Sequence, residues 1–109
     1  MVERKLGTVV VSPAVLATIA RLTTLSVPGV VQMSPLGMHR LLGTRQDDGV
    51  KVRVLDEAVI LDIYIVAAAD INMLQLSREI QSKVARAIRE IVGMAVSEVN
   101  VHIVDVEVP

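Results

Sequence analysis

Two histidines are the side chains of this sequence best suited to acid–base or metal chemistry, and neither stands in a recognisable motif. His39 lies in a glycine-rich stretch, and His102 lies in the final apolar run VSEVNVHIVDVEV. A metal site normally needs three or four converging ligands, but the sequence has no HxH or HExxH pattern and no cysteine. We therefore expect His102 to be a solvated strand residue, with a functional role as the alternative. That alternative is stronger for His39, because loops carry function more often.

The acidic pairs and the serines have structural explanations too. Asp47–Asp48 and Asp56–Glu57 each stand beside a predicted turn, where acidic residues are favoured. The serines form no G-x-S-x-G elbow, and the glycines form neither a P-loop nor a G-x-G-x-x-G motif. No nucleophile, base and orienting group can be recognised together, so we expect no enzyme activity and no cofactor.

Length and composition favour one globular domain that binds other proteins. A chain of 109 residues predicts a single domain over residues 1–109. The net charge of −1 and the single aromatic residue, Tyr64, argue against nucleic-acid binding, which uses basic patches and aromatic platforms. Because 52% of the residues are apolar, some apolar surface is expected to remain outside the core, which predicts a homo-oligomer.

The apolar runs are too short to place the chain in a membrane. The N-terminus lacks the apolar region and cleavage site of a signal peptide. The densest apolar run, from Ala58 to Ala69, contains Asp62 and falls short of the roughly 20 residues that cross a bilayer. Together with the absence of cysteine, this predicts a cytoplasmic protein that reaches a membrane through a partner.

The first half of the chain predicts two short strands and a helix. Gly7–Val11 is β-branched and predicts a strand, and Ser12-Pro13 is typical of a helix start, with Ser12 as the N-cap. Pro28-Gly29 ends that helix, and GVVQM (29–33) predicts a second short strand. The residues expected on the buried face of the helix are Val15, Leu16, Ile19, Leu22 and Thr23.

The second half predicts a hairpin, a long helix and a final strand. Valines alternate with Lys51 and Arg53 before the turn at Asp56–Glu57, so the two flanking strands should pair antiparallel, with Asp62 facing water or these two cations. Asn72 is a plausible N-cap for a long amphipathic helix that Gly93 ends. The predicted fold is α+β, a mixed and largely antiparallel sheet with two helices on one face, in the order β-α-(β)-β-β-α-β.

Two segments could form a protein-binding surface. In the last strand the apolar phase changes after Ile103, which requires either a bulge near Val104 or a strand end covered on its other face. The second alternative makes a contact surface of Val104, Val106 and Val108. The connector MHRLLG offers a second surface, and its alternative is a helical turn folded back on the core. Its residues are Met38, His39, Arg40, Leu41 and Leu42.

The whole pattern resembles the alkaline shock protein family. The resemblance rests on GTVVVSPAVLATIARLTTLSVPGVVQM, on DDGVKVRV, and on the block that begins at Asn72 and ends in VSEVNVHIVDV. It implies a small cytoplasmic α+β protein without known catalysis, linked to cell-envelope and general stress. Some members self-assemble and are held at the membrane by a separate anchor protein, and others are linked to control of fatty-acid synthesis. Two roles follow as hypotheses: a self-associating scaffold near the envelope, or a regulatory module that controls an enzyme.

Overall fold

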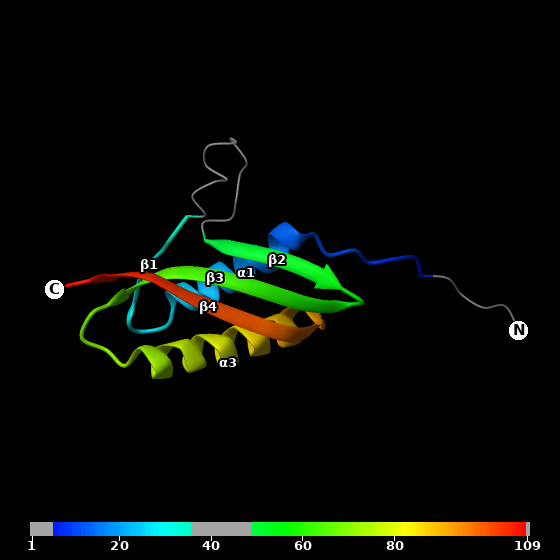
Figure 1. The fold of residues 1–109 in the computed structure, drawn as a ribbon. Helices are drawn as coiled ribbons and strands as arrows, with labels where there is room; N and C mark the ends of the chain where they lie inside the picture. Colours follow the sequence, from blue (N-terminus) through cyan, green and yellow to red (C-terminus); the bar gives the residue numbers. More distant parts are fainter. Residues whose placement is uncertain (1–5, 36–48, 109) are drawn as a thin grey trace, which may run out of the picture.

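The computed structural model describes residues 6–35 and 49–108, which form two helices and a four-stranded sheet (Figure 1). Its elements in chain order are α1 (Pro13–Leu25), β1 (Val30–Met33), β2 (Val50–Leu55), β3 (Ala58–Ala68), α3 (Met73–Val92) and β4 (Ala95–Glu107). The α+β class and the alternation of elements from Pro13 onward are as predicted.

β3 is the central strand of the sheet. β4 runs parallel to it along its whole length, and this parallel pairing requires the crossover that α3 supplies. The other edge of β3 pairs antiparallel with two strands placed end to end: β2 opposite Ala58–Ile63 and β1 opposite Ile65–Ala67. The sheet is therefore mixed, as expected, and both edges of β3 are occupied.

β1 and β2 meet at Tyr64. The Ser34 N–H donates to the Tyr64 carbonyl, and the Tyr64 N–H donates to the Gly49 carbonyl, each at 2.8 Å. The connection from 35 to 49 therefore leaves and returns at one point on β3. Gly49 has a φ of +91°, and a Cβ built on it would lie 2.6 Å from the Ser34 carbonyl oxygen. This junction can hold only glycine.

The core lies between one face of the sheet and the two helices. Alternate residues of β3, from Val59 to Ala67, point to this face and are fully buried. α3 contributes an i, i+4 stripe over Leu76–Ile88. α1 packs against α3, β1 and β2, and α3 packs against β4. The two helices thus cover the same face, as predicted.

The helix ends follow the sequence signals. The Ala14 N–H donates to the Ser12 hydroxyl at 3.2 Å, and the Gln75 N–H donates to the Asn72 side-chain oxygen at 2.9 Å. Gly93 adopts φ +82°, and its N–H donates to the carbonyls of Ile88 and Arg89. Both predicted N-caps and the glycine stop of the long helix are confirmed.

The predicted first strand is wrong. Residues 6–12 form no strand, and Val9 and Val10 are 90% and 84% exposed. β-propensity reflects packing against neighbouring strands more than an intrinsic backbone preference. Gly7–Val11 has no such neighbour, because no strand of the described residues pairs with it.

The predicted buried face of α1 is wrong in part. Leu16 is buried as expected, but Val15 and Leu22 are 47% and 56% exposed. α1 carries a single charge, Arg21, so its apolar residues surround the axis and do not single out one face. The residues that α1 buries are Leu16, Ala17, Ala20 and Thr24.

The change of phase in the last strand is a β-bulge. The register of β4 against β3 passes from Ile103 to Asp105, so Val104 is the extra residue. A second irregularity lies at Ser97. The bulge returns Val106 to the helix-facing side, opposite Ala67. The first of the two alternatives for this strand is therefore confirmed.

Substituting Gly49 by Ala should lower the free energy of unfolding by at least about 2 kcal/mol, because the new methyl group meets backbone oxygens that cannot move independently. Gly93→Ala is the matched control. It has a similar positive φ but nothing within 4 Å of its added Cβ, so it should cost only about 1 kcal/mol. Urea unfolding measures both, and an equal or smaller loss for Gly49→Ala would contradict the account of the junction.

Thr24→Val should raise the free energy of unfolding by about 1 kcal/mol. Thr24 is fully buried, and its hydroxyl has no hydrogen-bond partner within the described residues. Valine keeps the shape and removes a polar group that burial destabilises. A lower melting temperature for the variant would show that the hydroxyl is satisfied in solution.

Candidate functional site

The face of the sheet opposite the helices carries a polar row centred on Asp62. On β3, Ile60, Asp62 and Tyr64 point to this face. The strand register sets Lys51 of β2 on one side of Asp62 and Asn100 of β4 on the other. Because every second residue of each strand points the same way, three strands contribute side chains to one patch.

Asp62 holds this patch together. Its Oδ1 lies 3.0 Å from Nε2 of His102, and its Oδ2 lies 3.6 Å from Nη2 of Arg53. Tyr64 stacks on His102, with ring centroids 4.4 Å apart and an angle of 10° between the rings. The Asp62 side chain is 14% exposed, against 42% for His102 and 50% for Arg53. We call these four residues the Asp62 cluster.

The pKa of Asp62 depends on two opposing effects, which are burial of the carboxyl group and its contacts with neighbouring polar and charged groups. Burial of the carboxyl raises the pKa, which is the largest single effect. The hydrogen bond and charge of His102 lower it, with smaller contributions from the charge of Arg53 and a hydrogen bond with Asn100. The net result is a pKa below the ordinary value of 3.8. The carboxylate is therefore ionised at neutral pH and stabilised by its neighbours.

A carboxylate–imidazole pair can orient a general base, but catalysis also needs a nucleophile or substrate group within hydrogen-bond reach. In the described ranges, no hydroxyl group is hydrogen-bonded to His102. The Ser97 hydroxyl, five positions earlier on β4, donates to the Val59 carbonyl at 3.3 Å. The same ranges contain no group of three His, Asp or Glu side chains that could hold a metal ion. The cluster ties β2, β3 and β4 together on the open face.

Sequence reasoning found one half of this cluster. The predicted contact of Asp62 with a cation of the neighbouring strand is confirmed, and the cation is Arg53. His102 is a strand residue with a 42% exposed side chain, as predicted, but its contacts with Tyr64 and Asp62 were not predicted. Asp62 and His102 are 40 positions apart, and only the parallel register of β3 and β4 brings them together.

The predicted contact residues lie elsewhere. Met38, His39, Arg40, Leu41 and Leu42 are outside the described residues. The three valines at the end of β4 lie beyond the Asp62 cluster along that strand. Their exposed fractions are 50% for Val104, 45% for Val106 and 75% for Val108.

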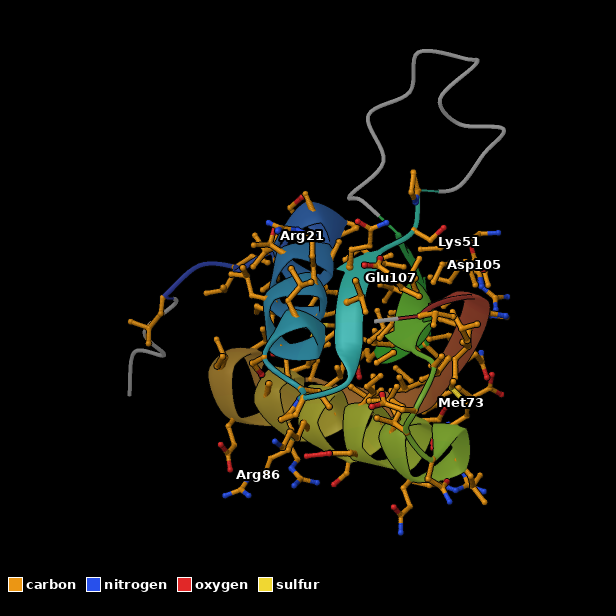
Figure 2. The ribbon with its side chains drawn as sticks, turned by 90° about the vertical axis from the view of Figure 1, so that its left-hand side faces the viewer. Arg21, Lys51, Met73, Arg86, Asp105 and Glu107 are labelled. Atoms are coloured by element: carbon orange, nitrogen blue, oxygen red, sulfur yellow. The ribbon has the colours of Figure 1, made fainter. Side chains whose placement is uncertain are left out.

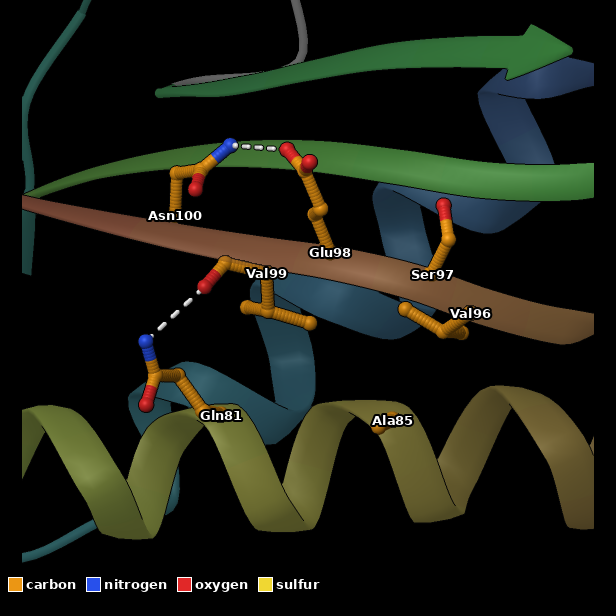
Figure 3. A pocket seen from close by; sticks show the side chains of 7 residues that line it. All are labelled: Gln81, Ala85, Val96, Ser97, Glu98, Val99 and Asn100. Carbon is orange, nitrogen blue, oxygen red and sulfur yellow. Dashed lines mark hydrogen bonds between the residues drawn. The ribbon is translucent and has the colours of Figure 1, made fainter.

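β4 has one paired and one open edge. β3 occupies the first edge, and no other strand of the described chain pairs with the second. Beside the open edge lies a hollow of about 330 Å³, which is bounded on the other side by α3 (Figure 3). Gln81 reaches across it, and its Nε2 donates to the Val99 carbonyl at 3.0 Å. The hollow is lined by Gln81, Ala85, Val96, Ser97, Glu98, Val99 and Asn100.

A second, larger hollow of about 830 Å³ lies at the end of the sheet where β2 turns into β3. The extended segment Val9–Val11 forms one wall, and the turn from α3 into β4 forms another. Much of the lining of this hollow is apolar, and Asp56 and Glu57 of the hairpin turn also line it. None of the helices in the described ranges is long and apolar enough to span a membrane.

The Asp62→Asn variant should lose about 1–2 kcal/mol of unfolding free energy at neutral pH, because it removes the charge from a hydrogen bond and an ion pair. Since the pKa is lower in the folded state, this contribution is present above about pH 3.8 and is lost as the pH falls through the folded pKa.

The difference between wild type and Asp62→Asn should therefore shrink in acid, as measured by urea unfolding between pH 7 and pH 2.5. Glu107→Gln, an exposed acid of β4, controls for the loss of one negative charge. A difference that stays constant with pH would show that the carboxylate is not stabilised by its neighbours.

Comparison with solved structures supports the fold. The MamM CTD in its copper form aligns with a TM-score of 0.59 at 14% identity, covering 89% of this chain and 86% of that one. A second MamM CTD structure aligns with a TM-score of 0.51, covering 88% and 98%. At this identity the similarity shows the fold alone.

Two relatives from Bacillus subtilis (strain 168) match almost the whole chain. The uncharacterized protein YqhY is 26% identical over 109 residues, covering 96% of this chain and 81% of the relative. The uncharacterized protein YloU is also 26% identical, covering 95% and 92%. The family model of the alkaline shock proteins, which are described as having a cell envelope-related function, matches residues 1–108. The resemblance seen in the sequence is thus confirmed, and the chain belongs to the alkaline shock protein family, whose function is related to the cell envelope.

Proposed function

We propose that this protein is a non-catalytic scaffold near the cell envelope, which binds copies of itself through β4. One observation carries the proposal: β4 is a 13-residue strand with an open second edge, and it ends in exposed valines. An open strand edge presents unpaired N–H and C=O groups that can hydrogen-bond to another strand. Val104, Val106 and Val108 add apolar contact area to that edge.

The bulge and the acidic residues of β4 protect its open edge, which favours a specific partner over nonspecific aggregation. Proteins protect open edges with charges and bulges, and β4 has a bulge at Val104 and the acids Glu98, Asp105 and Glu107. It contains no lysine and no arginine. A partner strand must therefore fit both a bulged backbone and a negative charge, which is a selective requirement.

The polar chemistry of the open face supports a role without catalysis. The Asp62 carboxylate is engaged by His102 and Arg53, and the imidazole is held against Tyr64. These contacts use the reactive groups to join strands. A stable, cross-linked sheet is what a scaffold requires of this face.

The connector Met38–Leu42 is a second proposed contact region, and it rests on sequence alone. Its flanking residues, Ser34 and Gly49, are anchored at Tyr64 on the edge of β3 opposite to β4. Ser34 and Gly49 therefore lie on a different edge of the sheet from the open edge of β4. The two regions together offer two attachment points per chain, as a scaffold needs.

Light scattering after size exclusion should give a mass above the single-chain value of 11.8 kDa that rises with protein concentration. Val106→Lys should shift the association to at least about tenfold higher concentration, because it places an ammonium group in the proposed apolar contact. Leu6→Lys is the control, because Leu6 is 89% exposed and lies outside the helices and strands.

A single-chain mass at every concentration would contradict the scaffold and favour a regulatory module that binds an enzyme. Equal association by wild type and Val106→Lys would contradict the assignment to the end of β4. The melting temperature of each variant shows whether a loss of association reflects misfolding.

A further inference from the structure

We propose that the partner of β4 is β2 of a second copy of this chain, so that the sheet continues from one copy to the next. This inference rests on the proposed self-association and specifies which strands of the two copies pair. The other open edge of the sheet belongs to β2 and the short β1: each pairs with β3 on one side, and within the described part of the chain no strand pairs with either on the other. The two open edges lie on opposite sides of the sheet (Figure 1).

The strand directions fit without rotating the second copy. β4 runs parallel to β3, and β2 runs antiparallel to it. A second copy placed beside the first in the same orientation therefore brings its β2 antiparallel to β4. Antiparallel pairs are the more stable and more common arrangement. The helices of both copies then remain on the same face of the extended sheet.

The register of β3 predicts a charge pair on the open face. Ile60 has Arg53 as its neighbour on β2 and Glu98 as its neighbour on β4. In a second copy at the same level, Arg53 would thus lie directly beside Glu98 of the first copy. The Arg53 side chain is half exposed, and the recorded contact of Glu98 is one 3.4 Å hydrogen bond from Asn100. Glu98 is thus available for this pair, and Arg53, which lies 3.6 Å from Asp62, would be shared between the two carboxylates.

The same register fills the hollow beside α3. Val54 shares a level with Val96, because both are opposite Val59, and Val52 shares a level with Val99 through Leu61. Val54 of the added strand would therefore face the 330 Å³ hollow over Ala85 (Figure 3), whereas Val52 already packs against the core of its own copy. Val54 is 43% exposed in the single chain. In the proposed register, the exposed Val54 of one copy would therefore lie beside Val96 and the hollow of the other copy.

Gln81 does not block the added strand. Its side-chain amide donates to the Val99 carbonyl from the α3 side. A carbonyl oxygen has two lone pairs and can accept a second hydrogen bond from a backbone N–H. In the single chain, Gln81 gives the Val99 carbonyl a hydrogen-bond donor, without which this carbonyl would face the hollow unpaired.

The helix layer continues in the same way. α1 packs under β2 and α3 packs under β4 (Figure 2), so the second copy brings its α1 towards α3 of the first. Because packed helices need about 8–10 Å between their axes and neighbouring strands lie about 5 Å apart, the extended sheet must curve with its helices on the outer side. α1 is the helix with an apolar outer side, and that side has no cover from the described residues of the single chain. Its exposed apolar residues are Val15, Leu22 and Leu25. Contact between the helix layers accounts for them.

Charge favours β2 over a second β4 as the partner. β4 carries three acids and no lysine or arginine, whereas β2 carries Lys51 and Arg53. Pairing two β4 strands would bring a strand of acids against another, which is unfavourable. Joining β4 to β2 uses two different surfaces of each copy, so the contact is not two-fold symmetric and can repeat from copy to copy as a filament, twisted by the twist of the sheet.

Two charge reversals test this geometry. Arg53→Glu and Glu98→Arg should each weaken self-association at least about tenfold, measured by light scattering across a concentration series. An equimolar mixture of the two variants should restore it, because each contact then pairs opposite charges at the two positions. The double variant should restore it alone. Electron microscopy should show filaments for the wild type, the mixture and the double variant.

The controls separate this inference from the proposed function. Val54→Lys, which should keep the fold because Val54 is exposed, should also lose association, and Leu6→Lys, at an exposed position outside the helices and strands, should keep it. These two variants still test the β4–β2 contact if Arg53→Glu disturbs Asp62 and prevents folding. If the wild type associates but Val54→Lys associates equally well, or the folded reversals are not rescued by mixing, the β4–β2 contact is wrong. If the wild type never associates, the scaffold itself is wrong.

Discussion

The pairing of both edges of β3 is the constraint on which the rest of this structure depends. β3 is hydrogen-bonded to β4 along one side and to β2 and β1 along the other. Its helix-facing side chains, from Val59 to Ala67, are buried under α1 and α3. Because the central strand has no edge left, the open edges of the sheet belong to β4 on one side and to β1 and β2 on the other. The positions at which this chain can bind another strand follow from that arrangement.

The position of Asp62 on the central strand also determines which polar groups can contact it. A carboxylate that is 14% exposed on the central strand is unfavourable unless neighbouring groups replace its hydration. The adjoining strands supply those groups, with Arg53 on one side and His102 on the other. The cluster therefore resembles part of a catalytic site in composition, but its geometry is that of a clamp across three strands.

The sequence was most informative where structure is local. The caps at Ser12 and Asn72, the stop at Gly93 and the two-residue turn of the β2–β3 hairpin each depend on residues within a few positions of one another, and all are confirmed. It was least informative where a residue's environment is set by distant segments. The β-branched run Gly7–Val11 is typical of a strand, yet whether it pairs depends on which edges other segments leave open.

The Asp62–His102 contact could not be predicted for the same reason. It depends on the parallel register of β3 and β4, which α3 and a bulge at Ser97 set together. The outer face of α1 was mispredicted because an apolar helix with one charge has no distinct polar side. The family, by contrast, could be identified from the sequence, since the pattern of strands, caps and glycines extends over almost the whole chain.

Amide hydrogen exchange at low and high protein concentration tests the central claim most directly, because it observes the strand edges themselves. If β4 is the association surface, the amides of Ala95–Glu107 should become more protected as concentration rises. The amides of β3, which are already paired on both edges, should not change. Protection of β4 that is the same at every concentration, in a sample whose mass rises, would contradict the account and move the contact to another surface.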